Sequence, residues 1–157
     1  MEIVTPTRAK RRFVQRLLAP PEAVFPLLCP VRETEWAVGW EPKRVYSHSG
    51  LAEPDCVFTT SGEGTDAIWV VSRYEPESHR VEFVKITPGL TACRIEIRLN
   101  RGRDGGSEAE VSYTHTALSE AGERFIRDFT QERFEAFMRA WESELNHFLR
   151  TGERLGA

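Results

Sequence analysis

Tyr113 and His115 are the two residues of this sequence whose types and spacing best suit chemistry. They stand two positions apart in a segment where apolar and polar residues alternate, so both side chains face the same side of a strand. In an apolar cavity, a phenol and a neutral imidazole could orient a ligand carbonyl or move a proton, as general acid–base chemistry requires. The alternative is a structural pair whose hydrogen bonds go to the backbone, and the sequence alone favours this second interpretation.

A second candidate site lies in the segment that carries Trp36 and Trp40. Indole side chains bury a large area wherever they lie, so this segment is either the rim of a ligand cavity or a packed turn. In the first interpretation Arg32, Glu33 and Glu35 supply polar groups at the rim. In the second, their charges are solvated.

Arg73 and Trp69 have the same parity in one expected strand, so both could reach the same cavity. A buried Arg73 would need a carboxylate partner or an anionic ligand, because an unpaired charge in an apolar interior is costly. An exposed Arg73 is the simpler interpretation.

The histidines and cysteines do not form a metal-binding pattern. The four histidines are scattered without a His-x-x-x-His pair, and no two of the three cysteines form a Cys-x-x-Cys pair. A Gly-x-Ser-x-Gly nucleophile elbow is also absent from the sequence. We therefore expect no metal and no cofactor, and the odd number of cysteines favours reduced thiols in a cytoplasmic protein.

The composition is typical of a folded domain. Of the 157 residues, 40% are hydrophobic and 29% are charged, and no apolar run approaches the length of a transmembrane helix. A net charge of −3 argues against nucleic acid as a partner, and the first residues do not resemble a secretory signal. We expect one domain over residues 1–157, with its core at about 8–150.

Five basic residues gather near the start of the chain and could form a phosphate-binding or membrane-surface patch. Charges of this kind also protect the exposed face of an edge strand from aggregation, and this interpretation is favoured. The residues are Arg8, Lys10, Arg11, Arg12 and Arg16.

Turn signals divide the chain into elements that must position these side chains. We expect a strand over 11–18, a short helix over 22–28 after two prolines, and a second helical turn over 31–36. Six further strands are expected over 43–47, 56–61, 65–74, 80–87, 90–100 and 108–118. Their connections are too short for crossover helices, so the sheet must be an antiparallel meander.

The remaining segment has the apolar periodicity of one long helix that begins after Ser119 and ends at Gly152. Thirty helical residues would span about 45 Å, enough to cross the whole sheet. The expected fold is therefore α+β, with a curved antiparallel sheet wrapped around a long C-terminal helix.

Two segments carry a resemblance to a known family. Residues 19–25, APPEAVF, are similar to the "APPE-x-VF" entry of START-like (SRPBCC) proteins, and residues 113–122 resemble their last strand running into the long helix. Within this superfamily the chain looks most like bacterial polyketide cyclase/dehydrase-like and lipid-transport-like proteins. The resemblance implies a helix-grip fold with an apolar tunnel between sheet and helix, and it carries no universal catalytic motif.

We therefore expect the protein to bind a small hydrophobic molecule, such as a lipid, an isoprenoid or an aromatic polyketide-like compound. The alternatives are a cyclase- or hydrolase-like enzyme that uses the same cavity, and a protein-interaction domain like the chaperone activators of the superfamily. The expected lining residues are Trp36, Trp40, Trp69, Tyr113, His115, Phe129 and Met138.

Overall fold

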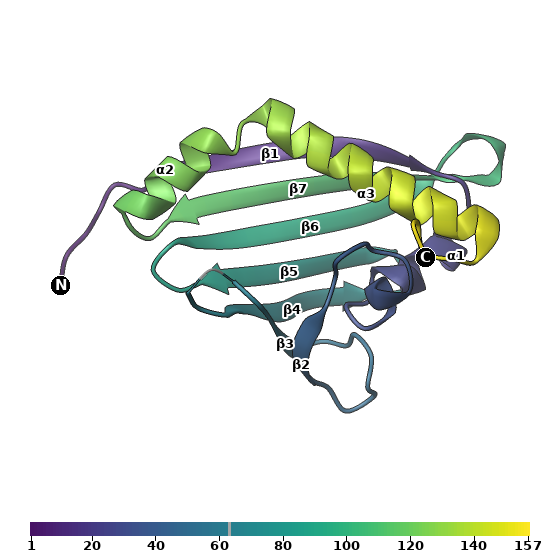
Figure 1. The fold of residues 1–157 in the computed structure, drawn as a ribbon, viewed down its shortest axis with the longest axis horizontal. Helices are drawn as coiled ribbons and strands as arrows, with labels where there is room; N and C mark the ends of the chain where they lie inside the picture. Colours follow the sequence, from purple (N-terminus) through teal and green to yellow (C-terminus); the bar gives the residue numbers. More distant parts are fainter. Residues whose placement is uncertain (63) are drawn as a thin grey trace.

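One antiparallel sheet of seven strands forms the frame of the protein (Figure 1). The computed structural model describes residues 1–62 and 64–157. The strands are β1 (Arg8–Leu17), β2 (Pro42–Tyr46), β3 (Val57–Thr60), β4 (Ala67–Glu75), β5 (Arg80–Thr87), β6 (Thr91–Arg101) and β7 (Ser107–Ala117). Their order in the sheet is β1-β7-β6-β5-β4-β3-β2, so the expected meander is confirmed, with β1 returning to pair with β7.

The helices lie in two groups. Short elements follow β1, namely α1 (Pro21–Val24) and the 3-10 helices η1 (Phe25–Leu28) and η2 (Arg32–Glu35), and a third 3-10 helix, η3 (Arg103–Gly105), joins β6 to β7. The C-terminal helices α2 (Glu120–Asp128) and α3 (Gln131–Thr151) run along one face of the curved sheet (Figure 1). The expected helix-grip architecture is therefore confirmed.

Alternation along the strands sends one set of side chains toward these helices. In β6, residues Cys93, Ile95, Ile97 and Leu99 are all buried, whereas the intervening Arg94 and Arg98 are exposed. An antiparallel sheet with one packed face and one solvated face requires this pattern.

The prediction of one continuous C-terminal helix is wrong, because the helix breaks at Phe129. This residue has φ −84° and ψ 68°, outside the helical region, and its N–H donates to the carbonyl of Phe125 to close α2. Thr130 then begins α3, and its hydroxyl accepts a hydrogen bond from the backbone N–H of Arg133 at 3.3 Å. A threonine N-cap stabilises a new helix start without interrupting the apolar periodicity.

Hydrogen bonds tie α3 to the edge strand β1. The Gln15 side chain donates to the backbone carbonyl of Met138 at 2.9 Å. Asn146 accepts from the N–H of Leu18 at 3.0 Å and donates to the carbonyl of Arg16 at 2.9 Å. These contacts satisfy backbone groups that an edge strand would otherwise leave open to another chain.

The basic residues of β1 have local partners. Arg12 forms an ion pair with Glu110 of β7 at 2.7 Å, and Nε of Arg8 donates to Thr116 at 2.8 Å. Arg11 instead points toward the helices, where its Nε donates to the carbonyl of Phe129 at 3.3 Å. These contacts agree with the edge-strand interpretation of the cluster.

No helix in the described part of the chain is long and apolar enough to cross a membrane.

Candidate functional site

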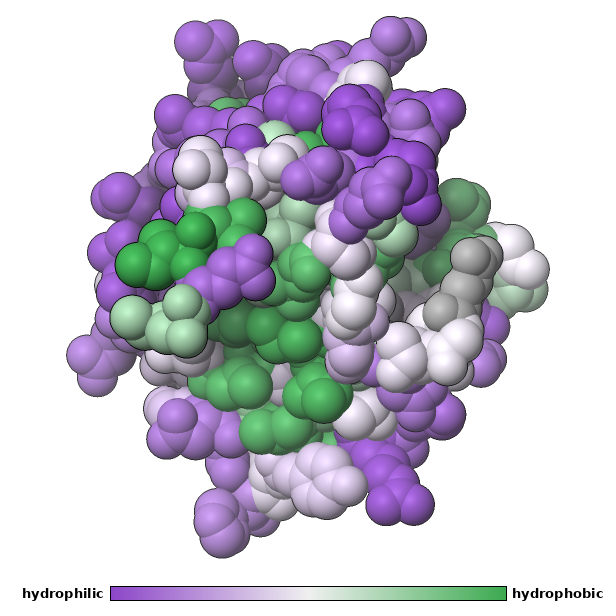
Figure 2. Space-filling model, turned by 90° about the vertical axis from the view of Figure 1, so that its left-hand side faces the viewer, coloured by the Kyte–Doolittle hydropathy of each residue, from purple (hydrophilic) through white to green (hydrophobic). Residues whose placement is uncertain are grey.

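A cavity of about 390 Å³ lies between the inner face of the sheet and the C-terminal helices. Figure 2 shows hydrophobic side chains gathered around a hollow on one side of the molecule. Residues of strands β3 to β7, of η2 and the segment after it, and of the C-terminal helical region line the cavity. They are Glu33, Ala37, Val38, Gly39, Trp40, Phe58, Trp69, Phe83, Lys85, Cys93, Ile95, Ile97, Tyr113, His115, Phe125, Phe129, Phe137, Ala140, Trp141 and Glu144.

Strand register places a row of functional side chains across one end of this cavity. Trp69 of β4 pairs with Lys85 of β5, which pairs with Cys93 of β6, which in turn pairs with His115 of β7. Directly opposed residues of neighbouring strands point to the same face of a sheet. All four side chains therefore reach the cavity, and Tyr113 follows two residues away from His115 on the same face.

Lys85 lies over an aromatic ring in this row. Its Nζ is 4.8 Å from the centre of the Trp69 ring, within the range of a cation–π interaction. The Trp69 indole N–H donates to Oγ1 of Thr60 at 3.0 Å, which fixes the orientation of the ring. Burial lowers the pKa of Lys85, because the apolar surroundings disfavour the charged ammonium.

His115 is buried among aromatic rings. Its ring centre lies 5.4 Å from that of Phe125, 5.6 Å from that of Phe129 and 6.0 Å from that of Tyr113. Desolvation, followed by the positive charges of Lys85 and Arg11, lowers the pKa of His115 to about 4. The imidazole is therefore neutral at pH 7.

The two other titratable groups at this end also stay uncharged. Burial raises the pKa of the Cys93 thiol to about 12, so a reactive thiolate does not form near neutral pH. Burial also raises the pKa of Tyr113, and this residue keeps its phenolic proton. Its ring is 5.2 Å from that of Phe134, so the phenol is supported from α3.

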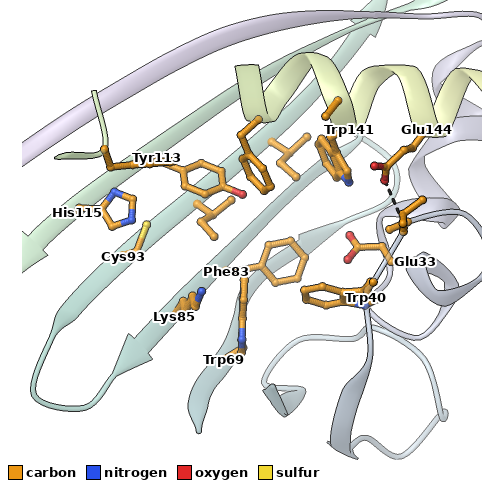
Figure 3. Close-up of a pocket in the computed structure, with 18 of the residues that line it drawn as sticks. Glu33, Trp40, Trp69, Phe83, Lys85, Cys93, Tyr113, His115, Trp141 and Glu144 are labelled. Atoms are coloured by element: carbon orange, nitrogen blue, oxygen red, sulfur yellow. Dashed lines mark hydrogen bonds between the residues drawn. The ribbon is translucent and has the colours of Figure 1, made fainter. Parts of the chain in front are cut away.

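Carboxyl groups line the opposite end of the cavity (Figure 3). The backbone of Glu33 is held in η2, where its N–H donates to the Cys29 carbonyl and its own carbonyl accepts from the Ala37 N–H, both at 2.8 Å. The side chain is buried, and desolvation raises its pKa to about 8. Glu33 is therefore mostly protonated at pH 7 and can donate a hydrogen bond into the cavity.

Glu144 and Trp40 complete this end. Oε2 of Glu144 on α3 accepts a hydrogen bond from the backbone N–H of Val38 at 3.0 Å, which links the helix to the loop after η2. The Trp40 indole donates to the carbonyl of Pro30 at 2.7 Å, and its ring packs edge-on against Trp69 at 5.6 Å. The contacts of Glu144 and Trp40 therefore hold the loop between η2 and β2 at the edge of the cavity.

The structure brings together more than half of the residues that the sequence singled out. The expected residues found in the cavity wall are Trp40, Trp69, Tyr113, His115, Phe129 and Glu33.

Two expected lining residues lie outside the wall. Trp36 is fully buried behind it, where its indole donates to the Leu27 carbonyl at 2.9 Å and its ring packs against Trp141. Met138 is buried one helical position beyond Phe137, which does line the cavity. A step of one residue turns a helical side chain by about 100°, so Met138 packs toward β1 instead.

Three expected rim residues also lie elsewhere. Arg32 and Glu35 form an ion pair with each other at 2.9 Å on the outer side of η2. Arg73 is exposed on the outer face of the sheet, because the β4–β5 register shifts between Val71 and Arg73. The extra residue of this bulge, Ser72, reverses the parity that Arg73 would share with Trp69.

Lys85 and Trp141 are the cavity residues that sequence reasoning missed most clearly. A signal existed for Lys85, because Val81 and Phe83 alternate with it along β5 and both are buried. Strand alternation therefore placed this lysine on the inner face. Trp141 belongs to the apolar periodicity of the C-terminal segment, and such a periodicity does not distinguish a cavity wall from a packed core.

Comparisons with solved structures agree with this architecture. Neither a family model nor a curated protein matches the sequence. Ara h 8.0201 has a TM-score of 0.60 at 15% identity, over 88% of this chain and 98% of its own. CalU16 from Micromonospora echinospora has a TM-score of 0.58 at 21% identity, over 94% and 85%. Truncated norcoclaurine synthase from Thalictrum flavum has a TM-score of 0.65 at 11% identity, over 90% and 96%.

These three structures are all START-like superfamily members, and at such identities the likeness concerns the fold. Each match covers at least 88% of this chain, so the likeness extends over nearly the whole fold. The chain therefore has the same helix-grip fold as these structures, as expected from the sequence.

Proposed function

We propose that the protein binds a small hydrophobic molecule, such as a lipid, an isoprenoid or an aromatic polyketide-like compound, in the cavity between the sheet and the C-terminal helices. The observation that carries this proposal is a space of about 390 Å³ with a mainly apolar and aromatic wall. Pockets for small ligands have volumes of about 300–1,000 Å³ and combine apolar walls with a few polar groups.

The distribution of polar groups supports the same proposal. Glu33, Lys85 and His115 face the cavity from three different elements, and none of their side chains hydrogen-bonds to another described residue. Buried polar groups normally have partners, so groups without one in a cavity wall are available to orient a ligand. The START-like resemblance independently implies an apolar tunnel at this place.

Native mass spectrometry of the protein purified from its own host tests this proposal, followed by denaturing extraction of any retained compound. A co-purified apolar molecule, or a rise in Tm with a lipid or aromatic compound, supports binding. At a ligand concentration of 100 times Kd, the gain in unfolding free energy is about 2.7 kcal/mol. An empty protein whose Tm does not respond to any compound overturns the proposal.

A variant locates the bound molecule. Ile95→Phe adds bulk to the middle of the cavity wall, whereas Ile68→Phe adds the same bulk to an exposed position on β4. We expect Ile95→Phe to weaken binding and Ile68→Phe to leave it unchanged. Equal affinities in both variants place the ligand outside this cavity.

Acid–base catalysis in the same cavity is a second candidate function, favoured by the neutral His115 and the protonated Glu33 that face one apolar space. Incubation of the co-purified compound with fresh protein tests it. Conversion that is lost in His115→Ala or Glu33→Gln supports an enzyme, and recovery of the unchanged compound supports a binding protein. The interaction-domain alternative requires a filled interior, which the cavity disfavours.

A further inference from the structure

The two ends of the cavity differ in charge, and this difference bears on the chemistry of the ligand. Figure 3 shows Lys85 and His115 near one end of the space. Glu33 and Glu144 lie at the other end, beside Trp40. Among the described lining residues these two carry the carboxyl groups, and neither forms an ion pair with Lys85.

Lys85 lacks the kind of partner that another lysine of this chain has. Lys43 is exposed and still forms an ion pair with Asp66 at 2.8 Å. Lys85 is partly buried, yet it forms no ion pair with any described residue, and its Nζ lies over the ring of Trp69. An ammonium in an apolar wall is costly unless an opposite charge accompanies it.

The neighbours of Lys85 do not supply that opposite charge. His115 is neutral at pH 7, and the Cys93 thiol and the Tyr113 phenol both keep their protons. Arg11 adds a further positive charge nearby, because it contributes to the lowered pKa of His115. This end of the cavity is therefore positively charged and has no internal anion among the described residues.

We infer that the ligand is a hydrophobic anion, an apolar and ring-containing molecule whose ionised acidic oxygen pairs with the Lys85 ammonium. This inference rests on the proposed function, since it names the class of molecule that the same cavity takes. The aromatic rings in the middle of the wall contact the body of the ligand. Charge-assisted hydrogen bonds of this kind are stronger than neutral ones, particularly where water is excluded.

Two dyes with a shared ring system separate the charge from the apolar body. N-phenyl-1-naphthylamine is uncharged, and 8-anilinonaphthalene-1-sulfonate carries one sulfonate on the same rings. Fluorescence titration gives a Kd for each dye with the wild-type protein, with Lys85→Met and with Lys10→Met. Lys10 is the matched control, because it is exposed on the outer face of β1 and its replacement removes the same charge.

We expect Lys85→Met to weaken sulfonate binding about 10- to 100-fold relative to binding of the uncharged dye, as expected for a hydrogen bond to a charged group. Lys10→Met should leave the ratio of the two Kd values unchanged. A ratio that is the same in Lys85→Met and the wild type overturns the inference, while binding of the uncharged dye still supports an apolar cavity.

Failure of both dyes to bind the wild-type protein at all counts against the proposed function itself. Methionine has a similar length and suits an apolar wall, so we expect Lys85→Met to fold. If that variant does not bind the uncharged dye, Lys85→Gln takes its place. Lys85→Arg keeps the positive charge and should therefore retain the preference for the sulfonate. Loss of the preference in Lys85→Arg, with uncharged-dye binding intact, also overturns the inference.

Discussion

Replacement of Glu33 by glutamine should make the protein more stable at alkaline pH, although it leaves the fold unchanged. The carboxyl group is buried in η2 and faces an apolar cavity, and its pKa is raised from 4.5 to about 8 by desolvation. Glutamine has nearly the same shape and cannot ionise. The variant therefore removes the pH dependence that this one group imposes.

The size and sign of the effect follow from the raised pKa. Below pH 4.5 the carboxyl is protonated in both the folded and the unfolded state, and its stabilising effect is fully present. From there to pH 8 the unfolded chain loses the proton while the folded protein keeps it. The free energy of unfolding therefore falls by about 1.4 kcal/mol per pH unit. The total loss of unfolding free energy above pH 8 is about 5 kcal/mol.

Thermal unfolding of the wild type and Glu33→Gln at pH 5, 7 and 9 measures this effect. Because about 1 kcal/mol corresponds to roughly 2–4 °C for a chain of this size, the Tm of Glu33→Gln should gain about 10 °C on the wild type between pH 5 and pH 9. Any constant cost of burying the amide cancels in this comparison. Glu35→Gln is the control, since Glu35 is half-exposed and paired with Arg32. A Tm difference that does not change with pH refutes a buried, protonated Glu33.

Three further predictions concern the cavity and its supports. Ile95→Phe fills open space and should change the free energy of unfolding by less than about 1 kcal/mol, whereas Val111→Phe, on the same sheet face but outside the cavity, should cost about 1–3 kcal/mol. Urea denaturation compares them, and equal costs would mean that the space is closed. Thr130→Ala removes the N-cap of α3 and should cost about 1 kcal/mol in the same assay, with Thr130→Ser close to the wild type. The pKa of His115 is lowered to about 4, so its imidazole should stay neutral at pH 5.5 in an NMR titration, and protonation near pH 6.5 would contradict its burial.

The strands and their packed faces could be predicted well from the sequence. Alternation around Tyr113 and His115 in β7 identified the inner face, and short turns between strands excluded crossover helices. Those signals are local, because each depends on a few neighbouring residues. The break between α2 and α3 escaped prediction since the apolar periodicity continues through Phe129 and Thr130.

The cavity residues were harder to predict, because position on an element does not reveal what lies opposite. Phe137 and Met138 are adjacent and both apolar, yet Phe137 lines the cavity while Met138 packs against β1. One bulge at Ser72 moved Arg73 to the outer face of the sheet. Lys85 has the strand parity of the inner face, but its significance depends on residues from other elements, namely Trp69, His115 and the two carboxyl groups of the lining, with which it forms no ion pair.

The pairing of β1 with β7 has a consequence for synthesis of the chain on the ribosome. β1 is made before the other strands, but Phe13 pairs with Val111, and Gln15 bonds to Met138. Most of the chain must therefore emerge before the first strand reaches its neighbours. Contacts between such distant segments slow folding, since a long loop must close before they form. Until β7 has been made, the charged side chains of β1 can keep this strand from pairing with the same strand of another nascent chain.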